Sequence, residues 1–231
     1  MQNSEFRIQN SEFHVLKRVS LFCGHYGSGK TNLAVNYAKA LRAAGRETAL
    51  ADIDVVNPYF RSKDSEAELR SLGIDVISLP FANTSVDLPS LPSEVYGLVQ
   101  RRDLFAVLDI GGDDRGALAL GRFAPYIAEE NDYDMFFVVN FYRPLTRTAA
   151  AALDVLREIE AATPLRFTSI INNSNLGEET APADIEKTFA EAQKLSALSG
   201  LPVAFTSVCE TLRGRVTGEN LFYISLQKKP F

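Results

Sequence analysis

The sequence contains little cysteine, and no two cysteines are spaced for a metal. Cys23 and Cys209 stand alone among the 231 residues, and no Cys-x-x-Cys pair occurs. Zinc and iron–sulfur sites that use only cysteine draw closely spaced thiolates from the chain. An all-cysteine metal site within one chain is therefore not expected.

Long hydrophobic runs and an excess of positive charge are also lacking. No apolar stretch reaches the length of a membrane span, and no signal peptide precedes the first predicted strand. The net charge of −5 argues against a general binder of nucleic acid or of anionic membranes. The hydrophobic fraction of 46% and the charged fraction of 23% are typical of a soluble globular protein. The length suits one domain with a sizeable core.

Residues 24–31, Gly-His-Tyr-Gly-Ser-Gly-Lys-Thr, match the phosphate-binding pattern G-x-x-x-x-G-K-[ST]. The glycines let several backbone N–H groups converge on one phosphate, at the positive end of the following helix. Lys30 is expected to reach the β- and γ-phosphates, and Thr31 to place its hydroxyl on Mg²⁺. An apolar run precedes the loop and a helical pattern follows it, which is the setting that this motif requires.

Strands and helices alternate after residue 14. Residues 1–14 are polar and lack periodicity, so we expect a loose extension before one domain at 15–231. The predicted strands are 15–23, 47–53, 74–79, 104–110, 135–140, 167–172, 202–207 and 221–226. The predicted helices are 30–44, 65–72, 93–101, 115–129, 145–162 and 183–198, with Gly45 and Gly200 as left-handed caps. This order predicts an α/β fold of the P-loop NTPase type, with an open, mostly parallel sheet and helices on both faces.

Carboxylates follow two of the predicted strands. Asp109 ends the strand 104–110, where it can hold Mg²⁺, and Gly112 lets the backbone approach a γ-phosphate. Asp52 and Asp54 close the strand 47–53, and alternation puts both on one side of the chain. We expect Asp54 to orient the attacking water and to be the third residue at the metal, beside Thr31 and Asp109.

The predicted strand 167–172 ends in Asn172, and Asn173 follows it directly. An amide offers both a donor and an acceptor, which suits the edge of adenine. Ordinary turn formation remains the alternative for both residues. The guanine-reading pattern N-K-x-D is absent, so ATP is the expected nucleotide.

Three segments, 23–31, 51–54 and 108–112, together resemble the MinD/ParA branch of P-loop ATPases, which includes the CobQ/CobB-type proteins and dethiobiotin synthetases. The resemblance implies a fold that often dimerises face to face around two ATP molecules. It also implies that Asp54 is the switch residue at the water and Asp109 the carboxylate beside Mg²⁺.

One residue departs from that branch. Its members usually carry a lysine directly after the first loop glycine, where this sequence has His25. A neutral imidazole supplies no fixed positive charge, so ATP-driven dimerisation is left open. The sequence also lacks the C-terminal amphipathic membrane helix of MinD-type proteins, and Lys228-Lys229 is too short a basic patch to replace it.

These observations favour a cytoplasmic, Mg²⁺-dependent ATPase that switches its surface for an unidentified protein partner, with a homodimer also open and with neither nucleic acid nor a membrane anchor expected. An ATP-dependent small-molecule kinase or amide-forming ligase is the alternative, with Tyr59, Arg61 and residues 80–92 lining an acceptor pocket. A nucleotide-binding module without catalysis is a third possibility. The predicted catalytic residues are Lys30, Asp54 and Asp109. The predicted nucleotide-binding residues are Gly24, His25, Tyr26, Gly27, Ser28, Gly29, Lys30, Thr31, Asn32, Gly112, Asn172 and Asn173.

Overall fold

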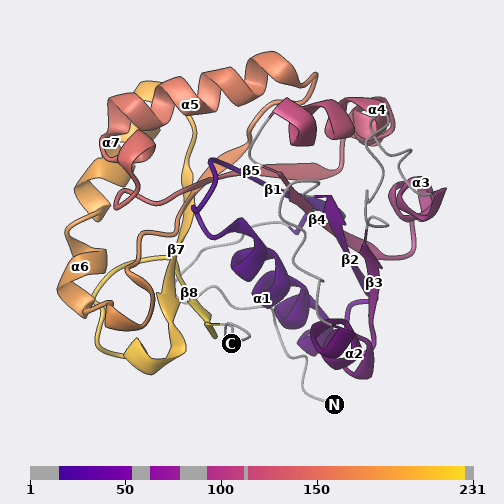
Figure 1. The fold of residues 1–231 in the computed structure, drawn as a ribbon, viewed down its shortest axis with the longest axis horizontal. Coiled ribbons are helices and arrows are strands. Elements are labelled where there is room, and N and C mark those ends of the chain that lie inside the picture. The colour runs from indigo at the N-terminus through magenta and orange to yellow at the C-terminus, as the bar shows by residue number, and fades with distance from the viewer. Residues whose placement is uncertain (1–15, 54–62, 79–92, 112–113, 227–231) are drawn as a thin grey trace.

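An open parallel sheet of eight strands runs through the protein in the computed structural model (Figure 1). The structure describes residues 16–53, 63–78, 93–111 and 114–226. The strands are β1 Val19–Cys23, β2 Thr48–Ile53, β3 Ile74–Ser78, β4 Phe105–Ile110, β5 Tyr133–Val139, β6 Ser169–Asn172, β7 Val203–Cys209 and β8 Leu221–Ile224. Their order is β3-β2-β4-β1-β5-β6-β7-β8, and every neighbouring pair is parallel. The predicted α/β fold is confirmed.

Helices cover both faces of the sheet (Figure 1). They are α1 Lys30–Ala43, α2 Lys63–Ser71, α3 Ser93–Gln100, α4 Asp114–Glu130, α5 Ala149–Ala162, α6 Pro182–Glu186 and α7 Phe189–Ser199. Short 3-10 turns lie at Pro144–Thr146, Gly177–Glu179 and Glu210–Leu212. Side chains of α1 and α2 pack on one face, and those of α3, α4, α5 and α7 pack on the other. None of the described helices has the length and apolar character needed to cross a bilayer.

Two of the predicted helices differ from the observed ones. The predicted helix 145–162 begins only at Ala149, where the Thr148 hydroxyl caps the first turn by accepting from the N–H of Ala151. The predicted helix 183–198 is divided into α6 and α7. The division lies at Thr188, whose hydroxyl donates to the Ile185 carbonyl at 2.6 Å, a local bond that competes with helix continuation. The left-handed caps at Gly45 and Gly200 are confirmed.

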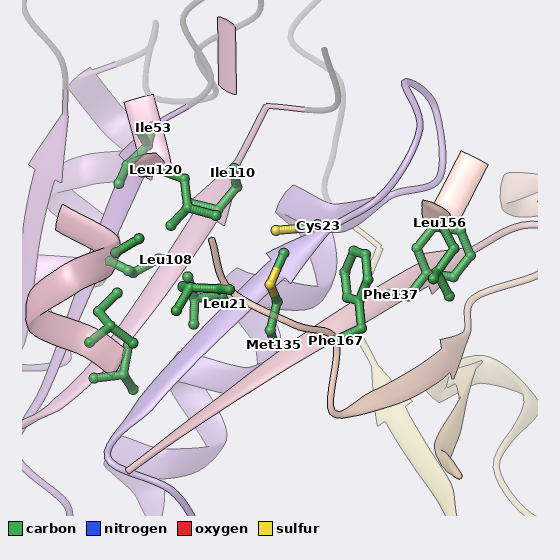
Figure 2. Close-up of a cluster of buried hydrophobic side chains, with 14 of the residues drawn as sticks. Leu21, Cys23, Ile53, Leu108, Ile110, Leu120, Met135, Phe137, Leu156 and Phe167 are labelled. Atoms are coloured by element: carbon green, nitrogen blue, oxygen red, sulfur yellow. The ribbon is translucent and has the colours of Figure 1, made fainter. Parts of the chain in front are cut away.

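The strands of the central sheet are buried on both faces, as their continuous apolar runs predict. Figure 2 shows the core on the face covered by α3, α4, α5 and α7, where Leu21, Leu108 and Phe137 from three neighbouring strands pack together. Val107 of β4 packs on the opposite face, with α1. Because side chains alternate along a strand, Asp109 lies on the α1 face as well. The sheet thus directs this carboxylate toward the helix that follows the phosphate motif.

Candidate functional site: a phosphate-binding loop at the carboxyl edge of the sheet

The loop from Gly24 to Gly29 leaves the carboxyl end of β1, the strand between β4 and β5. Gly24 passes so close to β5 that a Cβ atom would overlap the carbonyl oxygen of Val138. Gly29 has a φ of 86° and lies against the Asn173 amide, so a side chain would be both strained and obstructed there. The two glycines that define the motif are therefore required by the path of the loop.

Helix α1 starts directly from this loop. Its N-cap is Gly29, which offers no side chain to bond the first-turn N–H groups. Those N–H groups and the positive end of the helix dipole favour an anion at this position. The Lys30 side chain is only 5% exposed, and its Nζ atom lies 3.5 Å from the carbonyl oxygen of His25. The buried ammonium of Lys30 therefore lies against the loop that is expected to bind phosphate.

A hydroxyl and a carboxylate meet beside the loop. The Thr31 hydroxyl donates to Oδ2 of Asp109 at 2.5 Å, which joins the first turn of α1 to the end of β4. Asp52 of β2 stands in register with Asp109, and both carboxylates are 2% exposed. Leu50 packs on the α1 face of the sheet, so alternation places Asp52 on that face too. The two residues expected beside Mg²⁺, Thr31 and Asp109, are thus in direct contact.

This donor set suits Mg²⁺ held jointly by protein and phosphate. Mg²⁺ prefers oxygen ligands, keeps several waters, and is commonly bound by one or two protein groups together with substrate phosphates. Thr31 and Asp109 provide such oxygens next to the loop. Among the described residues no group of three or more His, Cys, Asp or Glu side chains is placed to hold a metal alone. The arrangement fits a metal that arrives with a nucleotide.

The thiol of Cys23 directly precedes the loop but faces the core (Figure 2). It is 1% exposed. Burial raises the pKa of this thiol and outweighs the lowering by the nearby Lys30, while Asp109 raises the pKa by less than Lys30 lowers it. The thiol therefore stays protonated and belongs to the packing of the core rather than to the chemistry of the site.

Asn172 does not have the orientation predicted for a residue that reads adenine. It is fully buried. Its Nδ2 group donates to Thr188 at 2.9 Å, and its Oδ1 atom accepts from the hydroxyl of Ser174 at 2.7 Å. Both ends of the amide are thus bonded inside the protein, and the edge predicted to meet a base is not presented. The turn alternative describes Asn172 better.

The side chain of Asn173 is hydrogen-bonded to the backbone of the loop. Its Nδ2 group donates to the Ser28 carbonyl at 2.6 Å, and its Oδ1 atom accepts from the hydroxyl of Ser207. The amide thus joins the end of β6 and a side chain of β7 to the loop, and Asn173 is 1% exposed. Its contacts give it a role in positioning the loop, and they leave no free amide edge for a base.

The remaining predicted residues divide into described and undescribed positions. Tyr26 is 67% exposed at the tip of the loop, and His25 is half-buried with its ring Nδ1 atom 3.0 Å from the Tyr26 carbonyl. Asn32 lies in the first turn of α1, where its carbonyl accepts from Asn36. Asp54, Gly112, Tyr59, Arg61, residues 80–92 and the extension 1–14 lie outside the described residues.

The structure adds one residue that the sequence motifs do not indicate. Arg143 follows β5 and donates from Nε to the carbonyl oxygen of Gly27 at 2.8 Å. In the sequence, Arg143 is recognisable only as a cation shortly after the predicted strand 135–140. The sequence does not show that this strand lies beside β1, the strand before the loop. Only the folded structure therefore identifies Arg143 as a residue that contacts the loop.

Comparisons with known proteins find similar structures but no similar sequences. No protein-family model matches the chain, and no curated protein sequence matches it. The signal recognition particle receptor FtsY from Elizabethkingia anophelis, in complex with GDP, superposes with a TM-score of 0.53 at 16% identity, over 87% of this chain and 59% of FtsY. FlhF complexed with GTP and Mg²⁺ superposes with a TM-score of 0.52 at 13% identity, over 83% of this chain and 66% of FlhF.

A third structure is a nucleotide-binding protein from Archaeoglobus fulgidus in complex with ADP. It superposes with a TM-score of 0.50 at 14% identity, over 91% of this chain and 82% of that protein. The chain spans about three fifths of the length of the FtsY structures that it matches. At these identities the likeness shows the P-loop NTPase fold. It does not single out the MinD/ParA branch, because the three structures carry GDP, GTP and ADP.

Proposed function

We propose that this protein binds ATP with Mg²⁺ and hydrolyses it slowly, as a nucleotide-controlled switch for a protein partner in the cytoplasm. The contact that carries the proposal is the bond from Thr31 to Asp109 at 2.5 Å, formed beside the buried Lys30. A hydroxyl, a carboxylate and an ammonium converge there on a loop of backbone donors. This combination matches the needs of a triphosphate and its metal.

Each residue has a distinct task in the proposed complex. The first-turn N–H groups of α1 and the Lys30 ammonium bind phosphate oxygens. Thr31 and Asp109 would hold Mg²⁺, directly or through water, and the bound ion would supply positive charge beside the phosphates. Asn173 keeps the loop in shape from below. Asp54 remains our proposal for the residue that orients the attacking water.

The component that stimulates ATP turnover distinguishes the proposed switch from the alternative, a small-molecule enzyme. ATP hydrolysis is measured with purified protein, alone and with cell extract fractionated by size. Stimulation by large components supports the switch, whereas stimulation by small components supports the kinase or ligase alternative. A complete absence of ATP binding in the purified protein rejects both.

Membership of the MinD/ParA branch is a further part of the proposal, and it concerns dimerisation. Branch members bring two triphosphates face to face, and His25 supplies no fixed charge between them. We expect ATP alone not to drive tight dimerisation at pH 7.5, and His25→Lys to strengthen it. Light scattering with a hydrolysis-resistant ATP analogue measures this, and a tight dimer of the parent would contradict it.

We predict that ATP is preferred over GTP. Asn175 stands three residues after Asn172, where the guanine-reading pattern places aspartate. A carboxylate accepts two hydrogen bonds from guanine, whereas an amide has one acceptor, and Oδ1 of Asn175 already accepts from Gly177 at 3.1 Å. Competition of ATP and GTP for a fluorescent nucleotide measures the ranking. Tighter binding of GTP would assign the protein to guanine nucleotides.

We predict that Asp109→Asn mainly weakens the dependence on Mg²⁺. The amide preserves the shape of the side chain and can still accept from Thr31, but it removes a negative charge beside the metal position. The Mg²⁺ concentration for half-maximal nucleotide binding or turnover is expected to rise about tenfold. Metal-free nucleotide affinity serves as the control and should not fall. An unchanged Mg²⁺ dependence would remove Asp109 from the metal site.

A further inference from the structure

Arg143 is held in place at both its backbone and its side chain. It lies between β5 and the turn Pro144–Thr146, where its N–H donates to the Asn140 carbonyl at 3.0 Å and its carbonyl accepts from Thr146 at 3.1 Å. The Thr146 hydroxyl also donates to the Asn140 carbonyl at 2.7 Å. This bonded turn fixes where the Arg143 side chain leaves the backbone. The side chain then runs to the phosphate loop.

The guanidinium packs directly on the loop. Nε of Arg143 donates to the Gly27 carbonyl at 2.8 Å, and a Cβ atom built on Gly27 would lie 3.4 Å from that Nε and 3.6 Å from Cζ. The Gly27–Ser28 peptide is thereby fixed with its carbonyl toward Arg143, and the Ser28 N–H on the other side donates to the His25 carbonyl at 3.1 Å. Arg143 therefore helps to set the direction in which a loop N–H points.

The same guanidinium has further donors to offer. Arg143 is exposed, and within the described segments its Nη atoms make no hydrogen bond. A guanidinium remains charged at any physiological pH and binds phosphate oxygens strongly. The loop position where a related ATPase would carry lysine is occupied by His25. The contacts of the structure thus place two cationic side chains at the loop, Lys30 and Arg143.

The charges around the loop favour a second cation. Lys30 is the cation within the motif, but two buried carboxylates, Asp52 and Asp109, lie on the same side of the sheet. A triphosphate adds several negative charges, of which Mg²⁺ cancels only part. In a partly buried site, each uncompensated charge weakens binding.

We propose that Arg143 is a second phosphate-binding cation, which supplies, from the connection that follows β5, the positive charge that His25 does not. The proposal rests on the proposed nucleotide-binding function and extends it to a residue outside the motif. Because the interaction is with phosphate charge, its strength should grow with the number of phosphate groups. A residue that only shapes the loop would affect all nucleotides alike.

The test compares two replacements that separate charge from hydrogen bonding. Arg143→Gln retains a donor for the Gly27 carbonyl but loses the charge, and Arg143→Lys retains the charge. Affinities for ATP, ADP, AMP and inorganic tripolyphosphate are measured by competition against a fluorescent nucleotide at low and high salt. Arg147→Gln is the matched control, since Arg147 is exposed four residues later on the same connection.

We expect Arg143→Gln to lower the affinity for ATP and for tripolyphosphate about tenfold and to leave the affinity for AMP almost unchanged. The salt dependence of ATP binding should become shallower, Arg143→Lys should restore most of the affinity, and the Tm of the nucleotide-free protein should not change. Equal losses for ATP and AMP, or parent-like affinity of Arg143→Gln for ATP, would overturn the assignment. Failure of the parent itself to bind any nucleotide would instead reject the proposed function, so the two failures are distinguishable.

Discussion

Replacing Lys30 by alanine is expected to lower the affinity for ATP by about 100-fold, because the triphosphate loses a charge-assisted contact in a partly desolvated loop. The Lys30 side chain is 5% exposed and lies against the loop carbonyl of His25. Removing it deletes the cation that the motif places among the phosphate oxygens. Isothermal titration with ATP and Mg²⁺ measures the loss.

The control for this prediction is Lys39→Ala on the same helix. Lys39 forms an ion pair with Glu68 at the surface, where the two side chains are 34% and 62% exposed. Such a pair contributes at most about 1 kcal/mol to stability, and ATP affinity should remain that of the parent. Thermal unfolding of both variants without nucleotide verifies that the fold is retained. Parent-like ATP binding by the Lys30 variant would refute phosphate binding by this loop.

The sequence predicts the elements well because their patterns are local. The continuous apolar run of β5 and the apolar face of α1, with Leu33 and Tyr37 buried, are readable from neighbouring residues. The meeting of Thr31 with Asp109 is also predictable, because the carboxyl ends of parallel strands share one edge of a sheet. The sequence patterns thus account for the fold class and for the contact at the centre of the candidate site.

The roles of Asn172 and Arg143 depend instead on contacts between distant segments. The amide of Asn172 is bonded to Thr188, the N-cap residue of α7, sixteen residues away in the sequence. The residue that the sequence offers as a ligand is therefore a buried structural one. Arg143 reaches Gly27 only because β5 lies beside β1. Neither the strand order nor side-chain burial is encoded in a short motif. The roles of these two residues could therefore be assigned only from the tertiary structure.

The largest expected effect on stability comes from the opposite end of the sheet, where Arg18 is buried just before β1. Its guanidinium donates to the carboxylate of Glu130 and to the carbonyls of Val99 and Arg101 at 2.6 and 2.8 Å. The Arg18 and Glu130 side chains are 6% and 7% exposed. Removing Arg18 leaves Glu130 with only Arg102, which is 62% exposed, and deprives the buried carboxylate and the two carbonyls of the Arg18 donors.

We expect Arg18→Met to lower the free energy of unfolding by about 3–5 kcal/mol. Urea unfolding at pH 7 measures the change. Lys187→Met is the control, since Lys187 is 72% exposed and lies 3.8 Å from Asp184, and its loss should be within about 1 kcal/mol. Equal stability losses in the two variants would show that the Arg18 pair behaves as a surface contact.

The same pair gives stability a defined dependence on pH. Burial raises the pKa of Glu130, but hydrogen bonds from Arg18 and Arg102 outweigh it and hold that pKa below its ordinary value of 4.5. A carboxyl whose pKa is depressed by folding stabilises the protein above its unfolded-state pKa and loses that contribution as the pH falls through the folded-state value. We therefore expect Glu130→Gln to be less stable than the parent at pH 7, with the difference shrinking below pH 4.5. Urea unfolding of both proteins across this window measures it, and a difference that stays constant down to acid pH would contradict an ionised Glu130 as the partner of Arg18.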